Sequence, residues 1–291
     1  MSESPDAEFY AELTARNVGV IDQAAQEVLR TASVLIAGCG SIGGAAIEPL
    51  ARLGIQHFTI ADPGTYELNN LNRQNATISD IGRNKAEVAA ERIRAVNPSC
   101  EVRVFQQGVA EDTLKNLTRI CDVVVDGVDV TTTSGLRAKY LLHQEATRRR
   151  LPLITGWDMA GAQYVRCYDY RKVRRTFDGQ ITLSDLDRLD MWHLLRRMIP
   201  ARYVPLEMIT IATSNLKNPD FNFPQLVYAA DLFGALSAHT VVQLLTDQPV
   251  RSHIYLDLHQ AIRPAAPRWR ARLRRPFLAA SAIAQFRRSA A

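Results

Sequence analysis

Cysteine is scarce in this chain. Its 291 residues include four cysteines, Cys39, Cys100, Cys121 and Cys167. No two of them have the C-x-x-C spacing of a paired-cysteine zinc site, so the sequence excludes a structural zinc of that type. Scattered, unpaired cysteines are typical of a reducing compartment, and we expect a cytoplasmic protein.

Long apolar runs are also absent. No stretch approaches the roughly 20 apolar residues of a membrane-spanning helix, and the polar, acidic segment Met1 to Tyr10 is unlike a signal peptide. Hydrophobic residues nevertheless make up 47% of the chain, an ordinary value for a globular protein. The composition predicts a plain globular enzyme with a substantial core and no transmembrane segment.

Acidic residues are missing from the end of the chain. Segment 263–291 holds eight arginines and no Asp or Glu. Because the whole chain has a net charge of only +5, the residues before this segment carry a net negative charge. An apolar stretch, Phe277 to Phe286, follows three prolines there. We expect a solvated arm that packs on a neighbouring subunit. An acidic peptide or carrier protein, or an anionic membrane surface, is the alternative partner. Nucleic acid is not expected, because no binding motif is recognisable.

A glycine-rich turn dominates the first half. The apolar run Val34 to Ala37 is of buried-strand type and leads into Gly38, Gly40 and Gly43, which have the G-x-G-x-x-G spacing. Glycine here permits a tight turn, close approach of backbone N–H groups to a phosphate, and close helix packing. Asp62 ends the next apolar run at the position that takes a ribose hydroxyl, unless it is only a turn residue. An NAD(P) or FAD site would share these features.

A polar stretch after Asp62 favours ATP over a dinucleotide. It contains Asn69, Asn70, Asn72, Arg73 and Gln74, and Lys85 follows at the start of the next helix. A diphosphate bridge is satisfied largely by backbone amides, whereas a triphosphate attacked at its α-phosphate needs cations for the charge on the leaving diphosphate. Arg73 and Lys85 could instead be surface charges.

Two carboxylates follow a third buried-strand run, Val123 to Val125. Asp126 ends this run, and Asp129 lies just beyond it, at the sheet edge where ligands bind in open parallel sheets. Mg²⁺ usually takes one or two carboxylates together with phosphate oxygens. The sequence therefore predicts Asp129 as a Mg²⁺ ligand, with strand termination or helix capping as the alternative for either aspartate.

Taken together, these motifs resemble the ThiF/MoeB/HesA superfamily, the adenylating fold shared with ubiquitin-activating enzymes. The matching segments are Gly38 to Gly44, Asp62, Asn69 to Gln74, Gly82 to Lys85 and Asp126 to Asp129. The resemblance implies an α/β fold, a doubly wound, Rossmann-like mixed sheet with helices on both faces.

The resemblance also implies roles for individual residues. Arg73, Lys85, Asp129 and Arg16 would be the catalytic set, with Asp129 on Mg²⁺ and Arg16 reaching the phosphates of the neighbouring subunit in a homodimer. The residues implied in nucleotide binding are Gly38, Gly40, Ser41, Gly43, Asp62, Asn70 and Gln74.

Two departures from the family pattern affect the mechanism. Val130 stands where the family usually has Asn, directly after the Mg²⁺ aspartate. No cysteine lies in the crossover between Asp169 and Phe221, where thioester-forming members carry theirs. Cys167 lies in an alternating, strand-like run, and nothing near it in the sequence predicts a lowered pKa except Arg166, on the opposite strand face. We therefore expect no enzyme thioester.

The chain divides into five segments. We expect an N-terminal helical arm (1–31), a nucleotide-binding adenylation core (32–169), a divergent crossover or substrate insert (170–221), a segment that completes the core (222–262) and the basic tail (263–291). Strands and helices alternate through the core. The predicted strands are Val34–Ala37, Phe58–Ala61, Glu101–Phe105, Val123–Val125 and Leu153–Thr155.

We expect an ATP-dependent enzyme that activates a carboxylate of a small molecule or peptide as an acyl-adenylate. With no crossover cysteine, the acyl group would pass directly to a nucleophile. Asp158, after the strand at 153–155, is a candidate substrate contact, while His143 and His193 are expected to be structural. The alternatives are a non-catalytic subunit that binds nucleotide or a partner, and an NAD(P)-dependent oxidoreductase.

Overall fold

A seven-stranded mixed sheet forms the centre of the computed structural model, which describes residues 5–215, 218, 221, 223–270, 273 and 276–278. The strand order is β3-β2-β1-β4-β5-β6-β7. The strands are β1 (Ser33–Ala37), β2 (His57–Ala61), β3 (Glu101–Phe105), β4 (Val123–Asp126), β5 (Pro152–Met159), β6 (Ala162–Asp169) and β7 (His253–Asp257).

Strands β1 to β5 are parallel, and β6 and β7 continue the sheet in antiparallel register. All five predicted strands are present, and the α/β class is confirmed. The prediction for β5 was too short. This strand runs to Met159 and pairs with β6 along its whole length, so Trp157 and Asp158 lie inside the strand and not after it.

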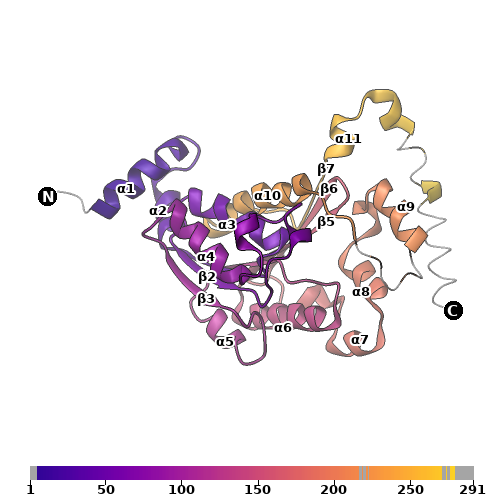
Figure 1. Ribbon diagram of the computed structural model, residues 1–291, viewed down its shortest axis with the longest axis horizontal. Helices are drawn as coiled ribbons and strands as arrows, with labels where there is room; N and C mark the ends of the chain where they lie inside the picture. Colours follow the sequence, from indigo (N-terminus) through magenta and orange to yellow (C-terminus); the bar gives the residue numbers. More distant parts are fainter. Residues whose placement is uncertain are drawn as a thin grey trace.

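Helices cover both faces of the sheet (Figure 1). One face carries α2, α3, α4 and α10. The other carries α5 and α6, with the crossover helices α7, α8 and α9 packed beside them. The α-helices are α1 (Pro5–Thr14), α2 (Gln23–Thr31), α3 (Ser41–Arg52), α4 (Lys85–Val96), α5 (Leu114–Leu117), α6 (Thr133–Arg149), α7 (Leu183–Arg188), α8 (Met191–Met198), α9 (Leu206–Asn215), α10 (Val227–Leu245) and α11 (Leu258–Ile262). Within the described residues, none of these helices is both long and apolar enough to cross a membrane.

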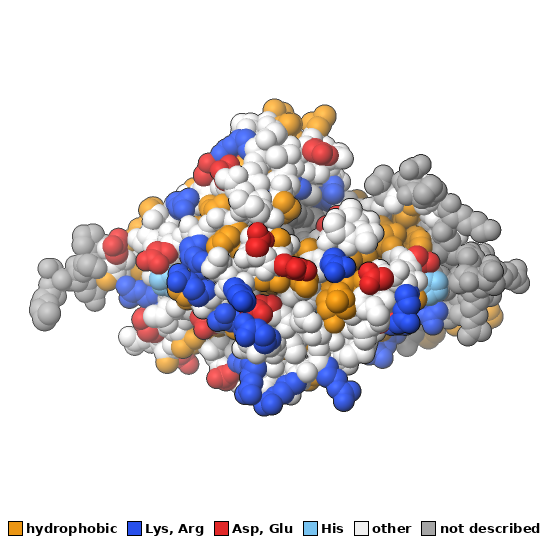
Figure 2. Space-filling model, turned by 90° about the horizontal axis from the view of Figure 1, so that it is seen from below, with side chains coloured by type: hydrophobic (Ala, Val, Ile, Leu, Met, Phe, Trp, Pro, Cys, Tyr) orange, Lys and Arg blue, Asp and Glu red, His pale blue; other side chains and the backbone are white. Residues whose placement is uncertain are grey.

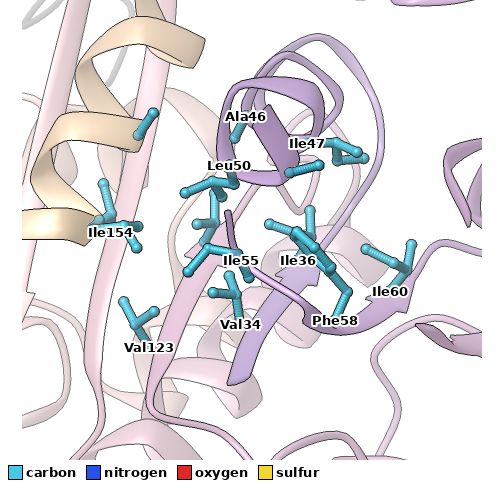
Figure 3. Packing of buried hydrophobic residues seen from close by; sticks show 14 of the residues in the cluster. Val34, Ile36, Ala46, Ile47, Leu50, Ile55, Phe58, Ile60, Val123 and Ile154 are labelled. Atoms are coloured by element: carbon cyan, nitrogen blue, oxygen red, sulfur yellow. The ribbon is translucent and has the colours of Figure 1, made fainter. Parts of the chain in front are cut away.

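Alternation along β1 divides the core into two layers. Val34 and Ile36 face α3, where they pack with Leu50 and Phe58 (Figure 3). Leu35, between them, belongs to the cluster on the α6 side. Both faces of β1 are buried, which is why the strand reads as a continuous apolar run and not as an alternating one.

The order of the strands reverses at β1. This strand has β2 on one side and β4 on the other, so the connections after β1 and β4 leave the sheet in opposite directions. A crevice opens at the carboxyl ends of the strands at such a point.

Helices that do not cover the centre of the sheet lie at the two ends of the molecule. Helix α1 projects from one end of the molecule, and α7, α8 and α9 form the opposite end (Figure 1). Viewed from the side of α5 and α6, basic side chains gather on part of that face (Figure 2). Lys115 on α5 and Arg148 on α6 are exposed. The predicted apolar stretch of the tail, Phe277 to Phe286, lies largely outside the described residues.

Candidate nucleotide and substrate site

A cavity of about 1200 Å³ lies at the carboxyl ends of the central strands. Its walls come from the glycine turn, the loop after β2, the connection from β4 to α6, the end of β5 and the crossover helices. Ligand pockets commonly measure about 300–1,000 Å³. The cavity therefore has room for a nucleotide and part of a second substrate.

The three glycines of the turn do different things. Gly38 has a φ of 84°, and a side chain there would meet the carbonyl oxygen of Gly127 at 2.4 Å. Gly43 lies inside α3, where a side chain would meet the carbonyl oxygen of Gly38 at 1.8 Å, so it serves helix packing and does not line the cavity. Gly40 caps α3 and faces the open cavity.

Asp62 ties the turn to the end of β2. Its carboxylate accepts hydrogen bonds from the backbone N–H of Cys39 at 2.5 Å and from that of Gly64 at 2.7 Å. The side chain is buried but lines the cavity. Because two carboxylate oxygens offer about four acceptor sites, lone pairs remain for ribose hydroxyls.

Arg73 is held in place by three acceptors. Its Nε donates to Oε1 of Gln225 at 2.6 Å, and a terminal nitrogen donates to the carbonyl of Asn69 and to Oδ1 of Asn72. Burial lowers the pKa of Arg73, and Asp158 and Asp129 oppose this change. An arginine stays charged in any such setting, so a fixed cation borders the cavity.

The segment Gly82 to Lys85 supplies a second cation. Asn84 caps α4 by accepting from the N–H groups of Ala86 and Glu87, which makes Lys85 the first residue of the helix. Lys85 lines the cavity, with its ammonium 5.5 Å from the ring centre of Tyr66.

Two side-chain amides of the segment Asn69 to Gln74 also line the site. The Oδ1 atom of Asn70 accepts from the N–H of Glu67 and fixes the loop. Oε1 of Gln74 is buried without a hydrogen-bond partner. A buried, unpaired acceptor is costly, and this one lies on a residue that lines the cavity, where a ligand N–H could satisfy it.

Asp129 faces the cavity from the exposed loop after β4. Its carboxylate accepts from the N–H of Thr131 at 2.9 Å and from the Thr131 hydroxyl at 2.7 Å. Among the described residues no cluster of three or more metal-binding side chains occurs. A single carboxylate fits Mg²⁺ if phosphate oxygens complete the shell.

Asp126, by contrast, belongs to a buried polar network. Its Oδ2 lies 2.6 Å from Nζ of Lys139 and 2.9 Å from Nε2 of His143, whose Nδ1 contacts the Tyr170 hydroxyl at 2.7 Å. Although burial opposes it, Lys139 and His143 lower the pKa of Asp126. These contacts occupy the carboxylate, and His143 is structural as predicted. The sequence analysis missed Lys139, although it stands four residues before His143 on one helical face.

Asp158 is unlike the other carboxylates. Only 8% of the residue is exposed, and neither carboxylate oxygen has a hydrogen-bond partner. Burial raises the pKa of Asp158 to about 6, against the opposing influence of Ser41 and Arg73. Ser41 and Arg73 thus offset only part of the free-energy cost of burying this carboxylate.

The far half of the cavity is mainly apolar, although Arg196 of α8 and Thr213 of α9 also line the cavity. Trp157 and Met159 project from the β5 face opposite to that of Asp158, and helices α8 and α9 close the wall. The apolar residues of this wall include Leu195, Ile199, Val204, Met208, Ile209 and Ala212. The sequence analysis placed substrate selection in this insert but found none of these residues, because their spacing matches that of any buried helix.

Two predicted features lie apart from the cavity. Arg16 is exposed on the short helix Ala15–Asn17 and does not line it. None of the four cysteines lines it either. Cys167 is buried on β6, and burial raises the pKa of its thiol to about 12, which disfavours the nucleophilic thiolate.

Comparison with known proteins decides the family. Residues 14–170 match the model of the ThiF family. The chain belongs to the ThiF family. This match contains every motif on which the resemblance was based.

Curated relatives of this ThiF-family chain include two proteins at 35% identity. One is the tRNA threonylcarbamoyladenosine dehydratase of Escherichia coli K12, matched over 51% of this chain and 53% of the relative. The other is a probable molybdopterin-synthase adenylyltransferase of Porphyra purpurea, matched over 36% and 28%. The chain thus spans about half or less of the length of these relatives.

Solved structures share the fold. PaaA is similar with a TM-score of 0.65 at 21% identity, covering 89% of this chain and 82% of PaaA. The E. coli tRNA threonylcarbamoyladenosine dehydratase, TcdA, is similar with a TM-score of 0.58 at 22% identity, covering 84% and 98%. At this identity the likeness establishes the fold alone.

Proposed function

We propose that this ThiF-family protein is an ATP-dependent adenylating enzyme that activates a carboxylate. The observation that carries the proposal is that Arg73 and Lys85 border one cavity together with the glycine turn and Asp62. Two cations exceed what a dinucleotide bridge needs, and they suit a triphosphate whose diphosphate must leave. The curated relatives include adenylyltransferases, which supports this reading over a nicotinamide site.

The reaction follows from the placement of these residues. A substrate carboxylate oxygen attacks the α-phosphorus, the bond to the bridging oxygen breaks, and diphosphate leaves with the electron pair. Arg73 and Lys85 neutralise the charge that accumulates on the diphosphate. Asp129 would hold Mg²⁺, which supplies further positive charge to the phosphates when bound.

The acyl group then passes directly to a nucleophile. All four cysteines lie outside the cavity lining, so none is placed to form a thioester. One related structure is of MccB with its peptide MccA, and a curated relative is a sulfur carrier protein adenylyltransferase. For this chain we propose a small-molecule or peptide carboxylate, because the crossover helices wall one side of the cavity and limit its volume.

The proposed assembly is a homodimer in a cytoplasmic setting. Arg16 is exposed and follows α1 in the chain, and α1 lies at the end of the molecule away from the crossover helices (Figure 1). We propose that Arg16 is available to a second copy there. The free thiols suit a reducing compartment.

Exchange of labelled pyrophosphate into ATP tests the function. The purified protein is incubated with Mg·ATP, labelled pyrophosphate and a panel of carboxylic acids and peptides. An adenylating enzyme exchanges label only when its carboxylate is present, and mass spectrometry then identifies the product. Tight NAD binding together with no Mg·ATP binding would contradict the proposal.

A further inference from the structure

Asp158 is the one carboxylate in the cavity lining whose two oxygens are both buried without a hydrogen-bond partner, among the residues that the structure describes. A buried, unpaired carboxylate costs free energy unless a ligand or a proton compensates it. Asp126 and Asp62 both accept hydrogen bonds or ion pairs from the protein, so the lack of a partner is a property of this position and not of every carboxylate in the site.

The surroundings of Asp158 place it beside the phosphates of the proposed substrate. Ser41 at the start of α3 and Arg73 on the loop after β2 are its polar neighbours, and Asp231 on α10 is the other charged group that acts on it. Gln163, opposite in register on β6, is neutral. Arg73 is also one of the cations that we assign to the phosphates, and a helix start such as that of α3 favours an anion beside it.

Resting on the proposed function, we propose that Asp158 is the proton-carrying residue of this site: it takes up a proton when a triphosphate enters the cavity and loses it when the diphosphate has left.

Two effects act in the same direction when the triphosphate binds. The phosphates bring negative charge near the carboxylate, which disfavours its ionised form. The phosphates also pair with Arg73. The charge of Arg73 favours the ionised form of Asp158 in the free protein, and this effect becomes weaker when the phosphates neutralise it. The pKa of Asp158, already raised to about 6 by burial, therefore rises further in the complex, into the range where a residue exchanges protons near neutral pH.

This behaviour gives Asp158 a part in acyl transfer. The proton held with the triphosphate departs with the diphosphate, which leaves a carboxylate beside the acyl-adenylate. An amine or hydroxyl nucleophile then attacks the acyl carbon, the carbon–oxygen bond to AMP breaks with its electron pair on AMP, and the nucleophile's proton passes to Asp158.

Calorimetry measures the proton directly. The Mg²⁺ complex of the α,β-methylene analogue of ATP is titrated into the protein at pH 7 in phosphate and in Tris, whose ionisation enthalpies differ. The wild type should take up about half a proton. Asp158→Asn, a nearly isosteric change, should take up almost none. Asp247→Asn removes an exposed carboxylate outside the cavity and should behave as the wild type.

A second readout is the pH dependence of affinity. Because the bound state favours the protonated form, affinity for the analogue should fall roughly five- to tenfold from pH 6 to pH 8 in the wild type and stay flat in Asp158→Asn. Binding without proton uptake, or uptake that survives in Asp158→Asn, overturns the role of Asp158 alone. No binding at all overturns the proposed function as well. If Asp158→Asn does not bind the analogue, the proton uptake measured with the wild type is the deciding result. Binding by the wild type without proton uptake overturns the proposal.

Discussion

Arg73 donates a hydrogen bond from Nε to Oε1 of Gln225 at 2.6 Å, across 152 positions of the sequence. Gln225 in turn donates from Nε2 to the hydroxyl of Ser41 at 3.3 Å. Gln225, at the end of the crossover, thus connects Arg73 to the start of α3. The geometry of the nucleotide half depends on a segment far from its own motifs.

Removing the guanidinium should weaken nucleotide binding. Arg73→Ala should bind Mg·ATP at least tenfold more weakly, because one charge-assisted contact is worth on the order of 1.4 kcal/mol. Gln225→Ala keeps the cation but loses its anchor, so its loss should be smaller. Isothermal titration calorimetry measures both, with Arg52→Ala, an exposed arginine on α3 outside the cavity, as the control. Unchanged affinity in Arg73→Ala would contradict the assignment.

Catalysis should not need a cysteine. A variant with Cys39, Cys100, Cys121 and Cys167 replaced by Ala or Ser should keep most of its pyrophosphate exchange and product formation, provided that its thermal melting shows a folded protein. The burial of Cys167 and the raised pKa of its thiol are the physical reasons. Loss of turnover in Cys167→Ser alone, with nucleotide binding and melting temperature intact, would restore a thioester mechanism.

Two inactive variants should complement each other in a dimer. If Arg16 of one subunit completes the site of the other, mixed dimers of Arg16→Ala and Asp129→Ala contain one intact composite site. Random exchange at equal amounts should then restore about a quarter of wild-type activity. The assay is pyrophosphate exchange, with light scattering to establish the oligomeric state. An active monomer, or mixed dimers that recover nothing, would refute the shared site.

Breaking the buried network should destabilise the fold. Asp126→Asn leaves Lys139 buried without its counter-ion, which should cost about 3–5 kcal/mol of unfolding free energy in urea titrations. The double variant Asp126→Asn/Lys139→Met should lose less than the sum of the single changes. Because the pKa of Asp126 is lowered in the folded state, the network's contribution is complete above the ordinary aspartate pKa of about 4 and falls away on acidification below it. Asp129→Asn, on an exposed loop, is the control.

The sequence predicted the features that arise from local causes. β1 and β4 are continuous apolar runs because both faces of their sheet are buried, and Gly38 stands where a side chain would collide with Gly127. The four-residue spacing of Lys139 and His143 is a further local feature, because it places both side chains on one face of α6, but the prediction did not use it.

Other features could not be read from the sequence, because they depend on distant contacts. Nothing near Gln225 indicates that it binds Arg73, and nothing near Asp158 indicates that its oxygens stay unpaired. The length of β5 was underestimated because its pairing with β6, and not its own composition, extends it to Met159.

The apolar wall of the cavity and the anchor of Arg73 come from one continuous stretch of chain, from α8 through Gln225. A change in the length or packing of this stretch would alter the shape of the cavity wall and, by the same displacement, shift Arg73, the cation that we propose for the phosphates. Replacing the crossover by that of another protein, in order to change the substrate, would therefore also disturb the chemical step unless the replacement keeps Gln225.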